Sequence, residues 1–175
     1  MEKFLSRKPT RLKNYNYGLQ NLYFITICVQ DRKQILSEIE LCSKPDMKNT
    51  CLIQYEDFAM QIKLKPCGVI AEEQLLALEK RYPCIELEDY VIMPDHIHAI
   101  LYLKETGGAS PSPTINDVVC AFKSLTSRLC KKQFGVEKIF QRSFADHIIR
   151  DFKDYELRKN YNHDNPRRWY SRISE

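Results

Sequence analysis

Two largely apolar segments separated by a short turn constrain the fold of this chain more than any other feature. Ile85–Ile92 alternates between apolar and polar residues and then becomes apolar, and His96–Leu103 is a second apolar run. Met93-Pro94-Asp95, which joins them, is typical of a turn. The sequence therefore predicts a hairpin-like pair of neighbouring strands.

The patterns on either side of this pair predict the rest of the architecture. In chain order, we expect a strand at Leu22–Val29, a helix at Gly68–Tyr82 ended by Pro83, the two strands above, a helix from the Thr114 cap to near Gly135, a strand at Ser143–Arg150, and a helix that begins near Asp151 and stops at Pro166. Residues 31–61 are weakly patterned and are expected to be irregular or partly helical. This order predicts an α+β, ferredoxin-like fold: a β-α-β-β-α-β antiparallel sheet with helices on one face, plus an added C-terminal helix.

Length and composition indicate one globular domain. The 175 residues, 43% hydrophobic and 29% charged, suffice for one core, with residues 1–21 as a basic N-terminal arm and residues 104–113 as a flexible loop. No apolar run reaches the roughly 18 residues that a membrane span needs, and the N-terminus lacks the apolar segment of a signal peptide. We therefore expect a cytoplasmic protein. Its seven cysteines form no C-x-x-C pair and are expected to be reduced thiols.

Charge is segregated along the chain. The net charge is +5 over residues 1–33, −7 over residues 34–119 and +7 over residues 120–172, although the whole chain carries only +4. Basic ends that meet in space would form a face suited to a polyanion. Two solvated surfaces of ordinary charge are the alternative.

His96 and His98 are the first candidate site. Residues at positions i and i+2 of a strand point to the same face, so the two imidazoles can hold one divalent cation. The alternative is a pair of half-buried histidines that are hydrogen bonded to the backbone.

Tyr161 and Asn165 are the second candidate site. Their i, i+4 spacing on the last helix places both on one face, where a hydroxyl beside an amide oxygen could supply a nucleophile and a further metal ligand. Asn165 is expected at the helix end, because a residue before proline avoids the α region. A core or surface aromatic is the alternative for Tyr161.

Taken together, the two sites resemble the HUH single-tyrosine transposases, and REP-associated tyrosine transposases in particular. The resemblance rests on Pro94-Asp-His-Ile-His98 after Tyr90-Val-Ile-Met93, and on Tyr161-x-x-x-Asn165-Pro166 followed by Trp169. It extends to Arg11-Leu-Lys-Asn-Tyr15, Tyr23–Thr26, Phe122-Lys-Ser124, Gln141-Arg-Ser143 and His147-Ile-Ile-Arg150, so it spans nearly the whole chain. Asp95 replaces an expected asparagine and Asn162 an expected apolar residue, while residues 36–62 and 104–113 match poorly.

The resemblance implies cleavage and rejoining of single-stranded DNA next to REP-like hairpins. His96, His98 and Asn165 would hold Mg²⁺, with Mn²⁺ as a substitute. Tyr161 would attack the phosphorus to give a 5′-phosphotyrosine and a free 3′-hydroxyl. The protein would act as a homodimer or as a monomer.

Several basic and aromatic residues are candidate DNA contacts. Those expected to contact a hairpin backbone, a flanking base or phosphates near the cut are Arg11, Lys13, Tyr15, Lys123, Arg142, Arg167 and Arg168. His147 is expected to be structural and His163 to be exposed.

Two other functions fit the same residues. One is a catalytically silent protein that binds DNA hairpins, for instance as a repressor. The other is a metal-dependent hydrolase that uses His96, His98 and a third histidine without a covalent step. An RNA-binding ferredoxin-like module is disfavoured, because the paired aromatic stacking motif of such modules is absent from the sequence.

Overall fold

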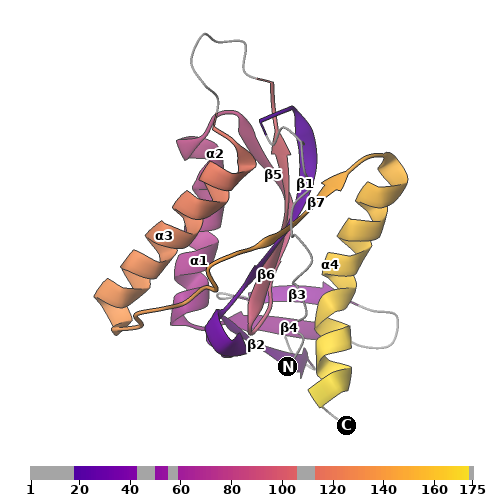
Figure 1. Ribbon diagram of the computed structural model, residues 1–175. Coiled ribbons are helices and arrows are strands. Elements are labelled where there is room, and N and C mark those ends of the chain that lie inside the picture. The colour runs from indigo at the N-terminus through magenta and orange to yellow at the C-terminus, as the bar shows by residue number, and fades with distance from the viewer. Residues whose placement is uncertain (1–17, 43–49, 55–58, 106–112, 174–175) are drawn as a thin grey trace, which may run out of the picture.

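A computed structural model describes residues 18–42, 50–54, 59–105 and 113–173. Its main sheet is antiparallel, with strand order β5-β6-β1-β7 (Figure 1). The elements of this unit are β1 (Asn21–Cys28), α1 (Pro66–Leu76), α2 (Leu78–Arg81), β5 (Ile85–Ile92), β6 (His96–Leu103), α3 (Ile115–Phe134) and β7 (Ala145–Ile149). The predicted ferredoxin-like β-α-β-β-α-β fold is confirmed.

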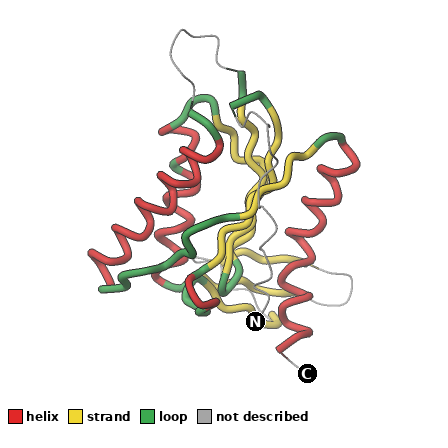
Figure 2. Tube along the Cα trace, viewed as in Figure 1, coloured by secondary structure: helices red, strands yellow, loops and turns green. Residues whose placement is uncertain are grey.

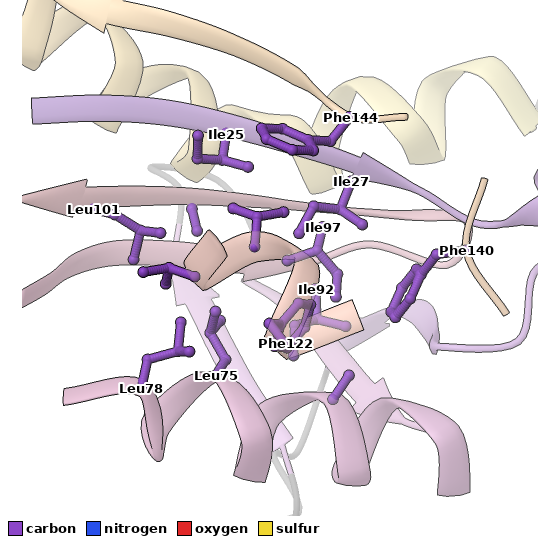
Figure 3. Packing of buried hydrophobic residues seen from close by; sticks show 14 of the residues in the cluster. Ile25, Ile27, Leu75, Leu78, Ile92, Ile97, Leu101, Phe122, Phe140 and Phe144 are labelled. Carbon is purple, nitrogen blue, oxygen red and sulfur yellow. The ribbon is translucent and has the colours of Figure 1, made fainter. Parts of the chain in front are cut away.

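The two faces of the sheet follow from the alternation of residues along β1. Tyr23, Ile25 and Ile27 are buried in one core cluster with side chains of α1 and α3, such as Leu75 and Phe122. Figure 3 shows this cluster from close by. The intervening residues of β1 point to the opposite face, because side chains alternate along a strand. That opposite face is covered by α4 (Phe152–Ile173), as Figures 1 and 2 show.

The ends of α3 confirm the helix signals in the sequence. The Thr114 side chain accepts a hydrogen bond from the backbone N–H of Asp117, and the Asp117 carboxylate accepts one from the backbone N–H of Thr114. This capping box satisfies donors that the first helical turn leaves unpaired. At the other end Gly135 has a φ of 70°, a left-handed conformation that glycine adopts without strain.

The prediction that residues 31–61 are irregular or partly helical is corrected by the structure. Residues 37–42, 50–54 and 59–64 form a second antiparallel sheet, with strand order β2-β4-β3. Its strands are β2 (Ser37–Cys42), β3 (Thr50–Gln54) and β4 (Ala59–Leu64). The strands are five or six residues long, so each carries too little alternation to be recognised locally. They are stabilised by packing against distant parts of the chain, since Ile39, Met60 and Ile62 form a cluster with side chains of β5 and α4.

The length of α4 corrects a second prediction. The helix begins at Phe152, close to the expected start, but it continues through Pro166 to Ile173, so Asn165 lies inside the helix and not at its end. A proline in a helix interior costs about 3 kcal/mol because it removes one hydrogen bond and crowds the preceding turn. Beyond Pro166, Trp169 and Tyr170 pack against the cluster of Ile39, Met60 and Ile62. Burying large aromatic side chains contributes free energy of similar size, so tertiary packing overrides the local signal.

The remaining differences are small. The helix predicted over residues 68–82 is divided at Ala77 into α1 and α2, and β7 is shorter than the predicted Ser143–Arg150. Most of the predicted N-terminal arm and of the loop at residues 104–113 lies outside the described residues. Within the described chain, no helix combines the length and apolar composition that crossing a membrane requires.

Candidate active site

His96 and His98 lie side by side on β6, on the sheet face that α4 covers. Their ring centroids are 4.6 Å apart, as expected for i and i+2 residues of one strand. Across the ladder they pair with Cys28 and Thr26 of β1. Both are nearly covered, with exposed fractions of 8% for His96 and 4% for His98. The arrangement places two imidazoles where one cation could contact both.

The partner of each Nδ1 atom fixes which nitrogen can bind a metal. His96 Nδ1 lies 2.5 Å from Asp95 Oδ1, and Arg32 lies 3.3 Å from the other Asp95 oxygen. Burial raises the pKa of the Asp95 carboxyl, but contacts with His96 and Arg32 outweigh burial and the pKa is lowered. Asp95 is therefore ionised and accepts a hydrogen bond from His96 Nδ1–H, so Nε2 is the nitrogen of this ring that is left to bind a metal.

His98 is neutral because it is buried. Burial, and then the neighbouring His96 ring, lower the pKa of His98 to about 3. Its Nδ1 lies 2.9 Å from Thr26 Oγ1, and the His98 ring is also hydrogen bonded to the backbone of Ile25. With Nδ1 engaged by Thr26, Nε2 is the nitrogen of His98 that is left to bind a metal. Metal-ligating histidines usually donate their other nitrogen to a carboxylate, a carbonyl or water, as His96 does to Asp95.

Three buried polar atoms are left unsatisfied around this site. Among the described residues, His98 Nε2, Asn162 Oδ1 and Asn165 Nδ2 have no hydrogen-bond partner. A buried polar atom without a partner costs about 1–3 kcal/mol, so such atoms often mark a ligand site. The His98 atom is the one that would bind a cation, and the donor set of two imidazoles and an amide fits a divalent ion.

Tyr161 lies directly over this part of the sheet. Its ring centroid is 5.3 Å from that of His98 and 6.1 Å from that of Phe24, and Phe24 itself stacks on His98 at 5.0 Å. The candidate nucleophile and the candidate ligand therefore come together within one chain. Arg168, two turns further along α4, places its Cζ atom 5.4 Å from the centre of the Tyr161 ring.

Asn165 lies between two residues of α4 that reach the histidines. Tyr161, one turn before it, contacts His98, and the Trp169 ring, one turn after it, lies 6.3 Å from that of His96. Residues four apart share a helix face, and Asn165 is only 2% exposed. The amide is therefore on the face of α4 that packs on β6, level with the two imidazoles.

The described residues offer few other metal ligands. In those ranges, no group of three or more His, Cys, Asp or Glu side chains could hold a metal ion. Among the described residues, no third histidine therefore joins His96 and His98, as a non-covalent hydrolase would need. A cation held by His96 and His98 must take its further ligands from Asn165, water or substrate.

The predicted DNA contacts that the structure describes lie on different elements of the fold. Arg142, Arg167 and Arg168 are exposed, whereas Lys123 is half-buried and donates to the backbone oxygens of Arg142 and Ser143, at 2.9 and 3.4 Å. Burial lowers the pKa of Lys123. The lysine therefore holds the segment before β7 in place. Arg11, Lys13 and Tyr15 lie outside the described residues, so their roles stay predictions.

Asn162, which departs from the expected apolar residue, has a specific partner. It is 2% exposed, and its Nδ2 donates to Asp89 Oδ2 at 2.6 Å. Asp89 follows a register shift in β5, which turns its carboxylate toward α4. Burial raises the pKa of Asp89, although the hydrogen bond from Asn162 opposes the shift. The polar replacement is thus compensated across the sheet–helix interface, and the helix is not loosened there.

Replacing Asp89 with alanine should destabilise the protein. The variant leaves both polar atoms of the buried Asn162 amide unpaired, so the free energy of unfolding should fall by about 1–3 kcal/mol in urea denaturation. Asp89→Asn keeps an acceptor oxygen and should cost less. Equal stability of Asp89→Ala and the wild type would show that the contact does not hold α4.

Sequence reasoning missed Phe24, Thr26 and Asp89 as parts of the site. Thr26 carried a usable signal, because a hydroxyl within an apolar strand marks the face that is not packed in the core. The position of Asp89 depends on a bulge, for which the sequence carries no local sign.

Comparisons with known proteins concern the fold of the chain. No protein-family model matches the chain. An uncharacterised protein of Haemophilus influenzae is 26% identical over 179 residues, which cover 93% of this chain and 89% of the relative. A solved structure of a REP-associated tyrosine transposase bound to a REP hairpin superposes with a TM-score of 0.57 and 20% identity, over 90% of this chain and 74% of that one.

The chain has the fold of a REP-associated tyrosine transposase. The resemblance inferred from the motifs is therefore confirmed at the level of the fold. In this transposase fold, the added helix α4 brings Tyr161 to the sheet face that carries His96 and His98.

Proposed function

We propose that the protein is a transposase that nicks and joins single-stranded DNA at hairpin-associated sites. The observation that carries the proposal is the 5.3 Å separation between the rings of Tyr161 and His98. A tyrosine held beside two imidazoles whose Nε2 atoms are left for a metal is suited to metal-assisted attack on a phosphodiester. The transposase of the same fold, solved with a REP hairpin, supports a DNA hairpin as the partner.

The residues of this chain have separate tasks in that reaction. The Tyr161 oxygen attacks the phosphorus, the bond from phosphorus to the 3′ oxygen breaks, and the strand is left with a 5′-phosphotyrosine and a 3′-hydroxyl. The phenol loses its proton during attack, because its ordinary pKa is about 10. Water or a substrate phosphate accepts that proton. The second step is the reverse: another 3′-hydroxyl attacks the phosphotyrosine and releases the Tyr161 oxygen. The joining step therefore consumes no ATP or other nucleotide cofactor.

His96, His98 and Asn165 are the residues that would hold Mg²⁺ or Mn²⁺. A bound divalent cation neutralises charge on the phosphate oxygens and favours departure of the 3′ oxygen. Asp95 and Thr26 orient the imidazoles through the Nδ1 atoms. Because α4 covers His98, the substrate phosphate enters only when the contact between Tyr161 and His98 opens.

We further propose that the reaction occurs in cis. Tyr161 and both histidines lie in the same chain, and α4 is held on its own sheet by the Asn162–Asp89 hydrogen bond and by the packing of Trp169 and Tyr170. The site therefore does not require a second subunit to supply the tyrosine.

A hairpin oligonucleotide with single-stranded flanks tests the function directly. The full-length protein is incubated with the end-labelled oligonucleotide and Mn²⁺, and the products are separated on a denaturing gel. We expect a covalent protein–DNA adduct that forms only with the divalent ion. Binding to the hairpin without any adduct would favour the silent DNA-binding protein, and cleavage without an adduct would favour the hydrolase.

A further inference from the structure

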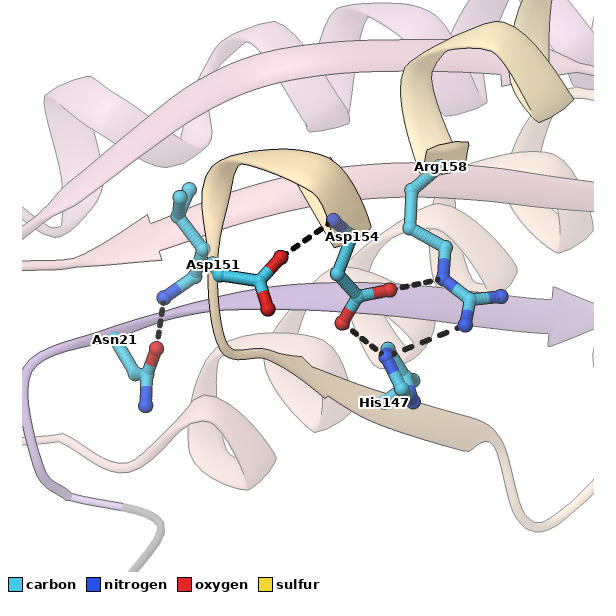
Figure 4. A network of polar contacts seen from close by, with 6 residues as sticks. Asn21, His147, Asp151, Asp154 and Arg158 are labelled. Carbon is cyan, nitrogen blue, oxygen red and sulfur yellow. Dashed lines mark hydrogen bonds and ion pairs between the residues drawn. The ribbon is translucent and has the colours of Figure 1, made fainter. Parts of the chain in front are cut away.

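A second polar cluster lies on the same sheet face, where α4 crosses β7. Figure 4 shows His147, Asp154 and Arg158 in mutual contact. His147 Nε2 lies 2.7 Å from Asp154 Oδ2, and Arg158 Nε donates to Asp154 Oδ1 at 3.1 Å. Asp154 is itself fixed, since its backbone N–H donates to Asp151 Oδ1 at 2.8 Å. The cluster joins the edge strand of the sheet to the first turns of α4.

One aromatic ring separates this cluster from the candidate active site. His147 pairs with Phe24 across the ladder, and the Arg158 Cζ atom lies 5.6 Å from the centre of the Phe24 ring. The same ring stacks on His98 at 5.0 Å and lies 6.1 Å from Tyr161. Arg158 is also one helical turn before Tyr161, on the same face of α4.

The hydrogen bonds inside the cluster leave one edge of the guanidinium free. Burial raises the pKa of Asp154, but hydrogen bonds from His147 and Arg158 outweigh burial and lower the pKa, so the group is an ionised acceptor. Arg158 donates from Nε to Asp154. One Nη lies 3.3 Å from His147 Nε2, but that nitrogen already donates to Asp154, so this Nη finds no acceptor there. Within the described parts of the chain, its other Nη makes no hydrogen bond. The free edge can still bind an anion in the two-pronged geometry that arginine offers to phosphate.

Access to this edge is also retained. The side chains of His147 and Arg158 are 42% and 28% exposed, whereas that of Asp154 is 18% exposed. The guanidinium, which has donors to spare, and the imidazole beside it are therefore more accessible than the carboxylate that holds them.

We propose that Arg158 and His147 form a subsite for a backbone phosphate of the DNA strand, adjacent to the phosphate that Tyr161 attacks. This inference rests on the proposed function and assigns it a second point of substrate contact. Asp154 is the positioning residue: it holds the imidazole and the guanidinium in a fixed relative orientation. A DNA strand that is held at two consecutive phosphates is aligned for attack by Tyr161. A single contact with the metal would not fix that alignment.

The salt dependence of DNA binding tests the subsite. Affinity for a labelled hairpin oligonucleotide with a single-stranded flank is measured at several NaCl concentrations, without divalent metal so that no cleavage occurs. Losing one phosphate contact on a single strand reduces the slope of log K against log salt by about 0.7. We expect this reduction for Arg158→Met, but not for Arg158→Lys, which keeps the charge.

Lys153→Met is the matched control. Lys153 is exposed on the first turn of the same helix, and its removal changes the net charge by the same amount. It should leave the slope unchanged. An unchanged slope in Arg158→Met, even with weaker binding, would mean that Arg158 only fastens α4 to β7, and the subsite would be rejected.

Modified DNA gives a second test that does not depend on the folding of the arginine variant. A neutral methylphosphonate is placed in turn at each phosphate of the single-stranded flank. We expect weaker binding to the wild type at one position and a smaller effect of that modification in His147→Gln. Equal effects at all positions would overturn the subsite. Failure of the wild type to bind the hairpin or to form the adduct would instead overturn the proposed function.

Discussion

Tyr161→Phe should abolish the covalent protein–DNA adduct and leave hairpin binding intact. The phenylalanine ring keeps the contacts with His98 and Phe24, which involve the ring and not the hydroxyl. The variant loses only the attacking oxygen, so the rate of adduct formation should fall at least about a thousandfold. The measurement is the denaturing-gel assay with labelled hairpin and Mn²⁺, together with a binding assay without metal.

Tyr155→Phe is the matched control for this prediction. Tyr155 is a partly buried tyrosine of the same helix and packs in the same small cluster as Tyr161. Its hydroxyl has no task in the proposed reaction, so this variant should form the adduct at the wild-type rate. Cleavage that persists in Tyr161→Phe without an adduct would reassign the protein as a hydrolase. An adduct that persists would place the nucleophile on another residue.

The sequence was sufficient for the part of the site that depends on local geometry. A spacing of two residues on a strand places His96 and His98 on one face of that strand. A spacing of four residues on a helix places Tyr161 and Asn165 on one face of that helix. Periodicity did not bring the two faces together: that expectation came from the resemblance to the HUH transposases. The structure places Tyr161 beside His98.

The failures arise where distant parts of the chain decide the structure. Pro166 is a strong local signal for a helix end, yet α4 continues because Trp169 and Tyr170 pack against side chains from β2 and β4. Those strands were themselves missed, because each is short. The two errors have one cause: the second sheet and the last turns of α4 stabilise each other.

Polar partners across the interface were beyond sequence reasoning for the same reason. In the sequence, Asn162 is only a departure from an expected apolar residue, and Asp89 carries no sign of a partner. Their 2.6 Å hydrogen bond depends on a bulge in β5 and on the position of α4 against the sheet. Likewise His147, expected to be structural, is joined to Asp154 and Arg158 on α4. A pair whose members come from two elements is visible only once both are placed.

His98→Phe should remove the stabilisation that a divalent cation gives to the protein. The substituted ring can still stack on Phe24 but cannot bind a metal. Without metal, the variant should lose little stability, because it removes the unsatisfied Nε2 atom together with the hydrogen bond to Thr26. Mn²⁺ at about 100 times its dissociation constant should stabilise the wild type by about 2.7 kcal/mol, seen as a rise in Tm. The variant should show no such rise.

This measurement separates the metal site from the DNA chemistry, since no substrate is present. His163→Ala is the control, because it removes an exposed histidine of α4 and should keep the full response to Mn²⁺. If His98→Phe were stabilised by Mn²⁺ as strongly as the wild type, the cation would be bound elsewhere. The buried Nε2 of His98 would then be an unpaired atom with no metal to bind. The proposal that Asp95 and Thr26 orient two metal ligands would be rejected as well.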